Sequence, residues 1–236
     1  SVMTGVSPWQ ENEDLHKAPF LWDLGKAVGM SSLIGSSQRY SWANFHPFFF
    51  SPGPDKILTA DYIDSPVVND LGIDDMVAID HFIDGLDGLP KDQRFFAVYN
   101  SNASHRPFQT ESSQIEKVPN FSGKYQQSLF VLDSSLAKLF DYLKKRGEYE
   151  ETLVIMTSDH GQDGLENLRF PRIVNYYEEV IAIPFIIKVP ASWRVTSPSY
   201  LLSLRANEDL NVSNVDLAPT IAEAMGIYQE NKDRFS

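Results

Sequence analysis

The spacing of apolar residues along the chain changes between two periods, which predict helices and strands. Apolar residues three and four positions apart predict helices in three segments, 20–29, 74–85 and 122–146. Short apolar runs predict strands at 31–35, 94–100 and 153–157. The long helix at 122–146 lies between two predicted parallel strands, so we expect it to form a right-handed crossover.

The strand at 153–157 is followed directly by chemically capable side chains. Its five residues are β-branched or apolar, which predicts a strand buried on both faces of a parallel sheet. Asp159 and His160 come next, and Gly161 is expected to let the backbone turn sharply away. Open α/β sheets bind ligands at the carboxyl ends of their strands. The pair therefore predicts a metal site, and a helix N-cap followed by a turn is the alternative.

Four aspartates on the helix at 74–85 raise a second metal hypothesis. The structural interpretation is stronger, because Asp74 and Asp75 suit the positive end of a helix dipole. Asp80 and Asp84 are expected on the solvated face of the same helix.

Composition limits the classes of protein to consider. The 236 residues, 42% hydrophobic and 12% aromatic, are enough for one large domain with a substantial core. The net charge of -12 argues against binding to nucleic acid or to an anionic membrane surface. The absence of cysteine excludes disulfides, thiolate metal sites and a cysteine nucleophile within these residues.

The region from 124 to 161 resembles a known superfamily. Its leucine spacing, Gly147 and the run Thr157-Ser-Asp-His-Gly161 resemble the sulfatase-like branch of the alkaline phosphatase superfamily, which includes sulfatases, lipoteichoic acid synthases and lipid A phosphoethanolamine transferases. The resemblance implies a three-layer α/β/α fold with a mostly parallel central sheet. It also implies that Asp159 and His160 hold a divalent metal ion. Mixed oxygen and nitrogen ligands favour Zn or Mn over Ca, although sulfatases with this pair also use Ca.

A second motif follows the strand at 94–100. Residues 101–108 contain His105-Arg-Pro107-Phe, which is similar to the H-x-P-(F/Y) sequence of sulfatase-like enzymes. That resemblance implies that His105 contacts the anionic substrate and acts in catalysis. An imidazole there can stabilise a phosphoryl or sulfuryl oxygen, or protonate a leaving group near neutral pH. Taken alone, His105 is a histidine that hydrogen-bonds within its loop.

The loop after Gly161 departs from the family pattern. Residues 177–187 resemble the family sequence, but sulfatases carry a lysine four residues earlier, where this chain has Ile173. The transferases place a further histidine in this loop, and this loop has none. Arg169 and Arg172 are the candidate replacements for binding the substrate anion, because a guanidinium can bind it through two hydrogen bonds. A reduced anion site is the alternative.

The start of the chain resembles the residues that follow the catalytic nucleophile in this superfamily. Residues 1–8 match S-(L/V)-(L/M)-T-G-x-x-P. The nucleophile and the first strand are therefore expected to precede Ser1, and residues 1–236 are expected to form a single sulfatase-like catalytic domain that lacks them. The resemblance also implies a periplasmic or extracellular location, with a membrane anchor outside these residues.

The resemblance implies a metal-dependent hydrolase that acts on sulfate or phosphate esters through a covalent intermediate. One alternative is a transferase of phosphoethanolamine or phosphoglycerol type, with an envelope lipid or glycan as acceptor. Another is a noncatalytic sulfatase-like sensor or binding domain. An anionic ester is the expected partner in the first two cases, and nucleic acid is not expected in any.

Overall fold

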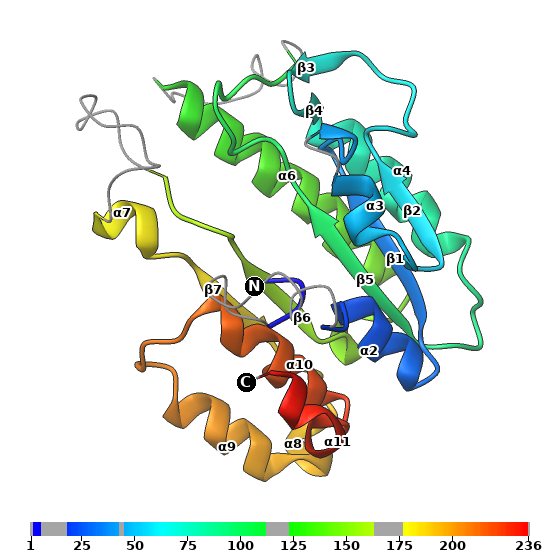
Figure 1. Ribbon diagram of the computed structural model, residues 1–236, viewed down its shortest axis with the longest axis vertical. Helices are drawn as coiled ribbons and strands as arrows, with labels where there is room; N and C mark the ends of the chain where they lie inside the picture. Colours follow the sequence, from blue (N-terminus) through cyan, green and yellow to red (C-terminus); the bar gives the residue numbers. More distant parts are fainter. Residues whose placement is uncertain (1, 6–17, 43–44, 112–122, 163–176, 236) are drawn as a thin grey trace.

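The computed structural model describes residues 2–5, 18–42, 45–111, 123–162 and 177–235 (Figure 1). Its strands are β1 (Ser31–Ser36), β2 (Lys56–Thr59), β3 (Val67–Asn69), β4 (Gly72–Ile73), β5 (Phe95–Asn100), β6 (Val154–Thr157) and β7 (Phe185–Lys188). Its α-helices are α2 (Leu21–Ala27), α3 (Phe45–Phe49), α4 (Asp75–Asp87), α6 (Lys124–Lys145), α7 (Glu178–Ile181), α8 (Trp193–Thr196), α9 (Pro198–Ala206), α10 (Leu217–Ala224) and α11 (Tyr228–Asn231). Short 3-10 helices are η2 (Tyr149–Glu151), η5 (Asn214–Asp216) and η6 (Lys232–Arg234).

The central sheet is parallel, with the strand order β2-β1-β5. In its register Ser36 pairs with Thr59 of β2 and with Asn100 of β5, so the three strands end level at one edge. β6 pairs with β7 in an antiparallel arrangement, and β3 pairs with β4 in the same way. The carboxyl edge of β1, β2 and β5 is the edge at which ligands bind in open α/β sheets.

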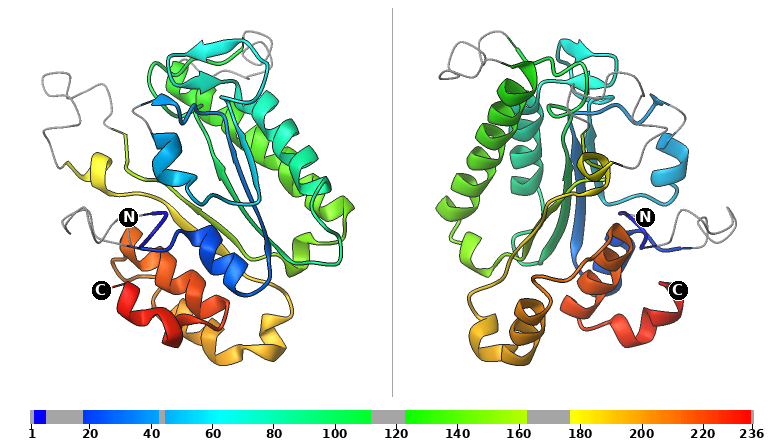
Figure 2. Two further views of the ribbon diagram at one scale, coloured as in Figure 1. Left: turned by 45° about the vertical axis from the view of Figure 1, so that its right-hand side comes forward. Right: turned by 90° about the vertical axis from the view of Figure 1, so that its left-hand side faces the viewer.

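Helices cover both faces of this sheet, as Figure 2 shows. Successive residues of a strand point to opposite faces, and β1 illustrates this clearly. Leu33 packs with α4 and α6, whereas Ile34 packs with Trp22 of α2 and with Phe49 of α3. The three-layer α/β/α fold with a mostly parallel central sheet is therefore confirmed.

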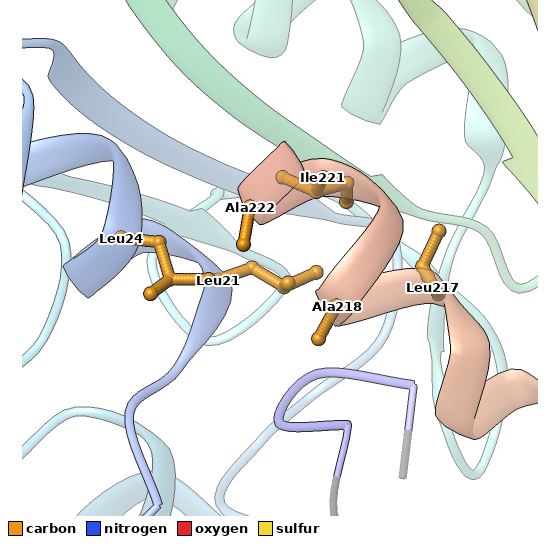
Figure 3. Close-up of a cluster of buried hydrophobic side chains, with 6 residues drawn as sticks. All are labelled: Leu21, Leu24, Leu217, Ala218, Ile221 and Ala222. Atoms are coloured by element: carbon orange, nitrogen blue, oxygen red, sulfur yellow. The ribbon is translucent and has the colours of Figure 1, made fainter. Parts of the chain in front are cut away.

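A further core joins the C-terminal helices to the strands (Figure 3). Leu21 and Leu24 of α2 pack against α10, and the buried residues that form this cluster are Leu21, Leu24, Leu217, Ala218, Ile221 and Ala222. Phe96 of β5, Ile155 of β6 and Phe185 of β7 pack against the same cluster. This shared core holds the β6–β7 pair beside the central sheet.

Glycines mark the ends of two helices where the sequence predicted them. α2 is followed by Gly29 at φ 74°, and α6 is followed by Gly147 at φ 73°. L-residues with a side chain rarely adopt this left-handed conformation, so a glycine there stops a helix at low cost. No helix in the described part of the chain is both long and apolar enough to cross a lipid bilayer.

Two sequence predictions about burial were wrong. β6 pairs with the antiparallel strand β7 and its side chains are half-buried, rather than buried on both faces of a parallel sheet. The apolar spacing of the predicted helix at 122–146 puts Leu129 on its inner stripe. Leu129 is instead 39% exposed, and the buried positions of α6 include Ser128, Val131 and Ser135. The two serines donate to carbonyls of their own helix, which satisfies their hydroxyls in the interior.

Close packing between β1 and α4 gives a prediction about stability. A Cβ added at Gly35 would lie 2.3 Å from Cδ2 of Phe82, which is 3% exposed. We expect Gly35→Ala to lower the free energy of unfolding by about 1–3 kcal/mol, because the ring must move within a packed core. Urea unfolding measures this. Gly123→Ala is the control, because its added Cβ meets only an atom 3.7 Å away; equal losses in both variants would contradict the prediction.

Candidate active site

The carboxyl edge of the sheet is built from polar side chains that hydrogen-bond across strands. Ser36 Oγ donates to the carbonyl of Asn100 at 2.8 Å, and the Ser37 amide donates to the same carbonyl at 3.2 Å. Asn100 Nδ2 in turn donates to the hydroxyl of Tyr40 at 3.2 Å. The ends of β1 and β5 are therefore fixed to each other at the edge where the candidate residues lie.

Asp159 stands two residues after the end of β6. Its side chain is 74% exposed. Burial raises the pKa of Tyr40, hydrogen bonds with Asn100 and Ser36 oppose that rise, and the negative charge of Asp159 adds to it. The charge of Asp159 is the smallest of these effects on Tyr40. β6 does not pair with β1 or β5 in the described residues.

His160 is oriented toward the carboxylate of Asp159. Its Nδ1 lies 2.7 Å from the carbonyl oxygen of Gly161, so Nδ1 carries the proton and Nε2 has a lone pair in the neutral ring. Nε2 is 3.6 Å from Oδ2 of Asp159. Ligands about 2.1 Å from a tetrahedral ion stand about 3.4 Å apart. The pair therefore fits two positions of one divalent ion.

The donor set is partial within the described residues. They contain no cluster of three or more His, Cys, Asp or Glu side chains able to hold a metal ion. An oxygen and a nitrogen ligand suit Zn or Mn. The metal role of Asp159 and His160 remains a proposal, because two ligands alone make an open site.

Backbone hydrogen bonds fix the turn that presents the pair. Asn214 Nδ2, at the start of η5, donates to the carbonyls of Ser158 at 3.0 Å and Asp159 at 3.2 Å. Ser158 Oγ donates to the carbonyl of His160 at 2.6 Å. The amide of Gly161 donates to Val180 of α7 rather than to Asp159, which is not the pattern of a helix N-cap.

Sequence reasoning missed Asn214. Ser213 and Asp216 cap η5, with Asp216 Oδ2 accepting from the Ser213 amide at 2.7 Å. Only the position of η5 beside β6 gives Asn214 its function. The position of Asn214 between the two capping residues indicated that its own backbone is held in place. It did not identify the residues that the Asn214 side chain binds.

Gly161 is required for a different reason from the one the sequence indicated. Its φ is not in the left-handed region. A Cβ at this position would instead stand 2.1 Å from the carbonyl oxygen of Glu179. The glycine lets α7 approach the backbone behind His160.

His105 lies in a turn after β5. Its amide donates to the carbonyl of Asn102 at 3.0 Å, and its carbonyl accepts from Phe108 at 2.9 Å. Nδ1 is 2.7 Å from the carbonyl oxygen of Arg106, which places the ring proton on Nδ1. The Phe108 ring contacts Tyr125 of α6 edge-on, with 5.0 Å between the ring centroids. His105 is half-buried.

Asp75 lies beneath this turn, and the sequence analysis gave it only a helix-start role. Asp74 is the N-cap, because its Oδ1 accepts from the Met76 amide at 2.8 Å, as predicted. Asp75 is 1% exposed and accepts four hydrogen bonds, from Ser37 Oγ, Tyr99 OH and the amides of Asn102 and Ala103. The sequence signal for a further role of Asp75 was the presence of a second aspartate, since one carboxylate is enough to cap the helix.

The buried charge of Asp75 makes stability depend on pH. Burial raises the pKa of this carboxyl from 3.8 to about 6, although its four hydrogen bonds oppose the rise. The folded state binds the proton of Asp75 more tightly than the unfolded state does, so protonation stabilises the folded protein. This stabilisation is complete below about pH 3.8 and is lost as the pH rises through about 6.

We therefore expect the stability of the wild-type protein, measured relative to Asp75→Asn, to fall by about 2 kcal/mol between about pH 4 and about pH 7. Asparagine does not titrate, so the comparison cancels the other carboxylates. Urea unfolding at a series of pH values measures both proteins. Parallel stability curves for the two proteins would contradict the prediction.

Other sequence candidates have separate outcomes. Arg169 and Arg172 lie outside the described residues, so their proposed contact with the substrate anion stays a prediction. His46 packs edge-on to Phe50, with 5.0 Å between centroids, and its Nε2 hydrogen-bonds the Tyr62 hydroxyl. The many aromatic residues around His46 in the sequence favour a packed loop histidine over a substrate contact. The ring is packed, but it lies in α3 and not in a loop.

Comparisons with known proteins agree with this arrangement. The sulfatase family profile matches residues 3–227. The chain is 27% identical to an N-acetylglucosamine-6-O-sulfatase of Bacteroides thetaiotaomicron over 57% of this chain and 25% of that protein. It is also 27% identical to a lipoteichoic acid synthase of Staphylococcus saprophyticus over 88% of this chain and 32% of that protein. The chain thus spans a quarter to a third of the length of these two relatives.

Solved structures share the fold. The lipoteichoic acid synthase LtaP of Listeria monocytogenes matches 96% of this chain with 58% of its own, at TM-score 0.70 and 19% identity. The C-terminal periplasmic domain of EptC from Escherichia coli, in complex with Zn, matches 95% of this chain with 66% of its own, at TM-score 0.70 and 15% identity. Because the family profile covers nearly all of the chain, this protein belongs to the sulfatase family, in the alkaline phosphatase superfamily.

Proposed function

We propose that this protein is a metal-dependent hydrolase of sulfate or phosphate esters that acts through a covalent enzyme intermediate. The observation that carries the proposal is the Asp159–His160 pair, which follows β6 and places Nε2 of His160 3.6 Å from Oδ2 of Asp159. Relatives that are sulfatases by name support an anionic ester as substrate. We also place it outside the cytoplasm, because one protein that shares its fold is a periplasmic domain.

The residues of this chain have separate roles in that proposal. Asp159 and His160 hold the divalent ion, for which Zn or Mn suits the ligand types better than Ca. When bound, such an ion polarises an ester oxygen and lowers the pKa of a hydroxyl nucleophile. When its ring carries a second proton on Nε2, His105 donates a hydrogen bond to an oxygen of the transferring group or gives that proton to the leaving oxygen. Arg169 and Arg172 neutralise the remaining charge of the substrate.

Transfer to a lipid or glycan acceptor is the second candidate. It is favoured by the lipoteichoic acid synthase match, which extends over 88% of this chain. Hydrolysis and transfer share the covalent step and differ in whether water or an acceptor hydroxyl completes it. A noncatalytic binding domain is the third candidate, and Ile173 at the lysine position of sulfatases is its motivation.

One experiment separates the three candidates. The intact protein is purified without chelators, its metal content is measured, and it is assayed with p-nitrophenyl sulfate, phosphate and phosphonate esters. Stoichiometric metal and release of p-nitrophenol would support the hydrolase. Metal with product formed only when a lipid or glycan acceptor is added would favour the transferase. A metal-free protein that leaves all three esters intact would overturn both enzymatic candidates.

A further inference from the structure

A buried carboxylate lies under the turn that presents His105. Oδ2 of Asp75 accepts from the amide of Asn102 at 3.2 Å and from that of Ala103 at 2.6 Å. The carbonyl of Asn102 in turn accepts from the His105 amide at 3.0 Å. One side chain of α4 therefore anchors the turn, two residues before the imidazole.

The other carboxylate oxygen connects this anchor to the sheet. Oδ1 of Asp75 accepts from Ser37 Oγ at 2.8 Å and from the Tyr99 hydroxyl at 2.8 Å. Ser37 directly follows β1, and Tyr99 belongs to β5. Four donors from three segments surround one carboxylate, which is about as many hydrogen bonds as its lone pairs accept. Its position is therefore fixed relative to the whole carboxyl edge.

We propose that Asp75 is a positioning residue, which holds the turn of Asn102 and Ala103 so that His105 keeps a fixed place at the carboxyl edge of the sheet. The proposal rests on the catalytic role of His105 in the proposed function. A loop ordinarily moves more than the elements it joins. A displacement of about 1 Å of a catalytic group can cost about 100-fold in rate. A buried acceptor that holds this loop in place prevents such a displacement of His105.

Because the four donors differ in chemistry, Asp75→Asn and Asp75→Ala are expected to keep different numbers of these hydrogen bonds. Backbone amides can only donate, whereas the hydroxyls of Ser37 and Tyr99 can turn and accept. Asp75→Asn can keep its carbonyl oxygen on the two amides and point its NH₂ group at the two hydroxyls. Asp75→Ala removes every acceptor and leaves the two amides buried and unsatisfied.

The test compares these two variants by amide hydrogen exchange and by kinetics. We expect Asp75→Ala to speed exchange at Asn102 and Ala103 by about 10-fold or more and to lower kcat/KM by about 10-fold or more. Asp75→Asn should stay within about 3-fold of the wild type in both measurements, because it keeps the two amide bonds. Combining Asp75→Ala with His105→Ala should add little to the kinetic loss from His105→Ala alone, since both changes act through one imidazole.

Asp74 gives a matched control at the adjacent position. Its carboxylate accepts from the amides of Met76 at 2.8 Å and Glu111 at 2.9 Å, not from the turn of Asn102 and Ala103. Asp74→Ala should therefore destabilise the start of α4 without faster exchange at those two amides. Equal effects in the two alanine variants, or unchanged exchange and kinetics in Asp75→Ala, would overturn the positioning role.

The exchange measurement also keeps this inference separate from the proposed function. A wild-type protein without esterase activity would refute the proposed function and, with it, a positioning role in catalysis, whereas exchange would still show whether Asp75 anchors the turn. If Asp75→Ala does not fold, amide exchange in the wild-type protein tests whether the turn is anchored. Protection of Asn102 and Ala103 equal to that of Tyr99 in β5 supports the anchor, and exchange as fast as in an exposed loop overturns it.

Discussion

Asp159→Ala is expected to lower kcat/KM for ester hydrolysis by about 1000-fold or more, together with loss of bound metal. Loss of a residue that only supports a metal ligand typically costs 10- to 100-fold in affinity or activity, so loss of the ligand itself should cost more. The side chain is 74% exposed, so the free energy of unfolding of the metal-free protein should change by less than about 0.5 kcal/mol. Metal content and kcat/KM are measured on the purified proteins, and urea unfolding is measured after the wild type and the variant have been stripped of metal.

Asp209→Ala is the matched control for this change. Asp209 is also an exposed carboxylate, so its removal alters the net charge equally. It should leave metal content and kcat/KM at the wild-type level. An Asp159→Ala protein that keeps its metal and its activity would refute the site proposed at the end of β6.

His105→Ala is expected to lower kcat by about 100-fold to 10,000-fold, because general acid catalysis by a positioned histidine contributes in this range. The loss should be greatest for esters with poor leaving groups, which depend most on protonation of the departing oxygen. Steady-state kinetics with two esters of different leaving groups test both expectations.

His81→Ala is the matched histidine control. It lies on the exposed side of α4, outside the turn after β5, and its loss should leave kcat unchanged. If His105→Ala retained kcat within about 3-fold of the wild type for both esters, His105 would have no catalytic role.

The chain's local patterns predicted the elements that depend on local chemistry. The ends of α2 and α6 were predictable because each glycine adopts a left-handed φ that other residues avoid. The Asp74 cap was predictable because a carboxylate satisfies amides within its own first turn. The adjacency of Asp159 and His160 is covalent, so no fold was needed to place those two side chains together.

The partners that define the candidate site were not predictable in this way. Asp75 looks like a second helix-start acid until Ser37, 38 residues away in sequence, and the turn after β5 close around it. Asn214 acquires its role from Asp159, 55 residues away. The pairing of β6 with the antiparallel strand β7 was likewise not predictable, because an apolar run of four or five residues is compatible with either strand direction.

The amino-acid sequence by itself determined the family, the positions of the main strands and helices, and the candidate groups Asp159, His160 and His105. Only the tertiary structure decided which polar groups are buried and which distant backbone atoms they bind. The reason is physical: capping and backbone conformation depend on neighbours in sequence, whereas desolvation and hydrogen-bond satisfaction depend on neighbours in space.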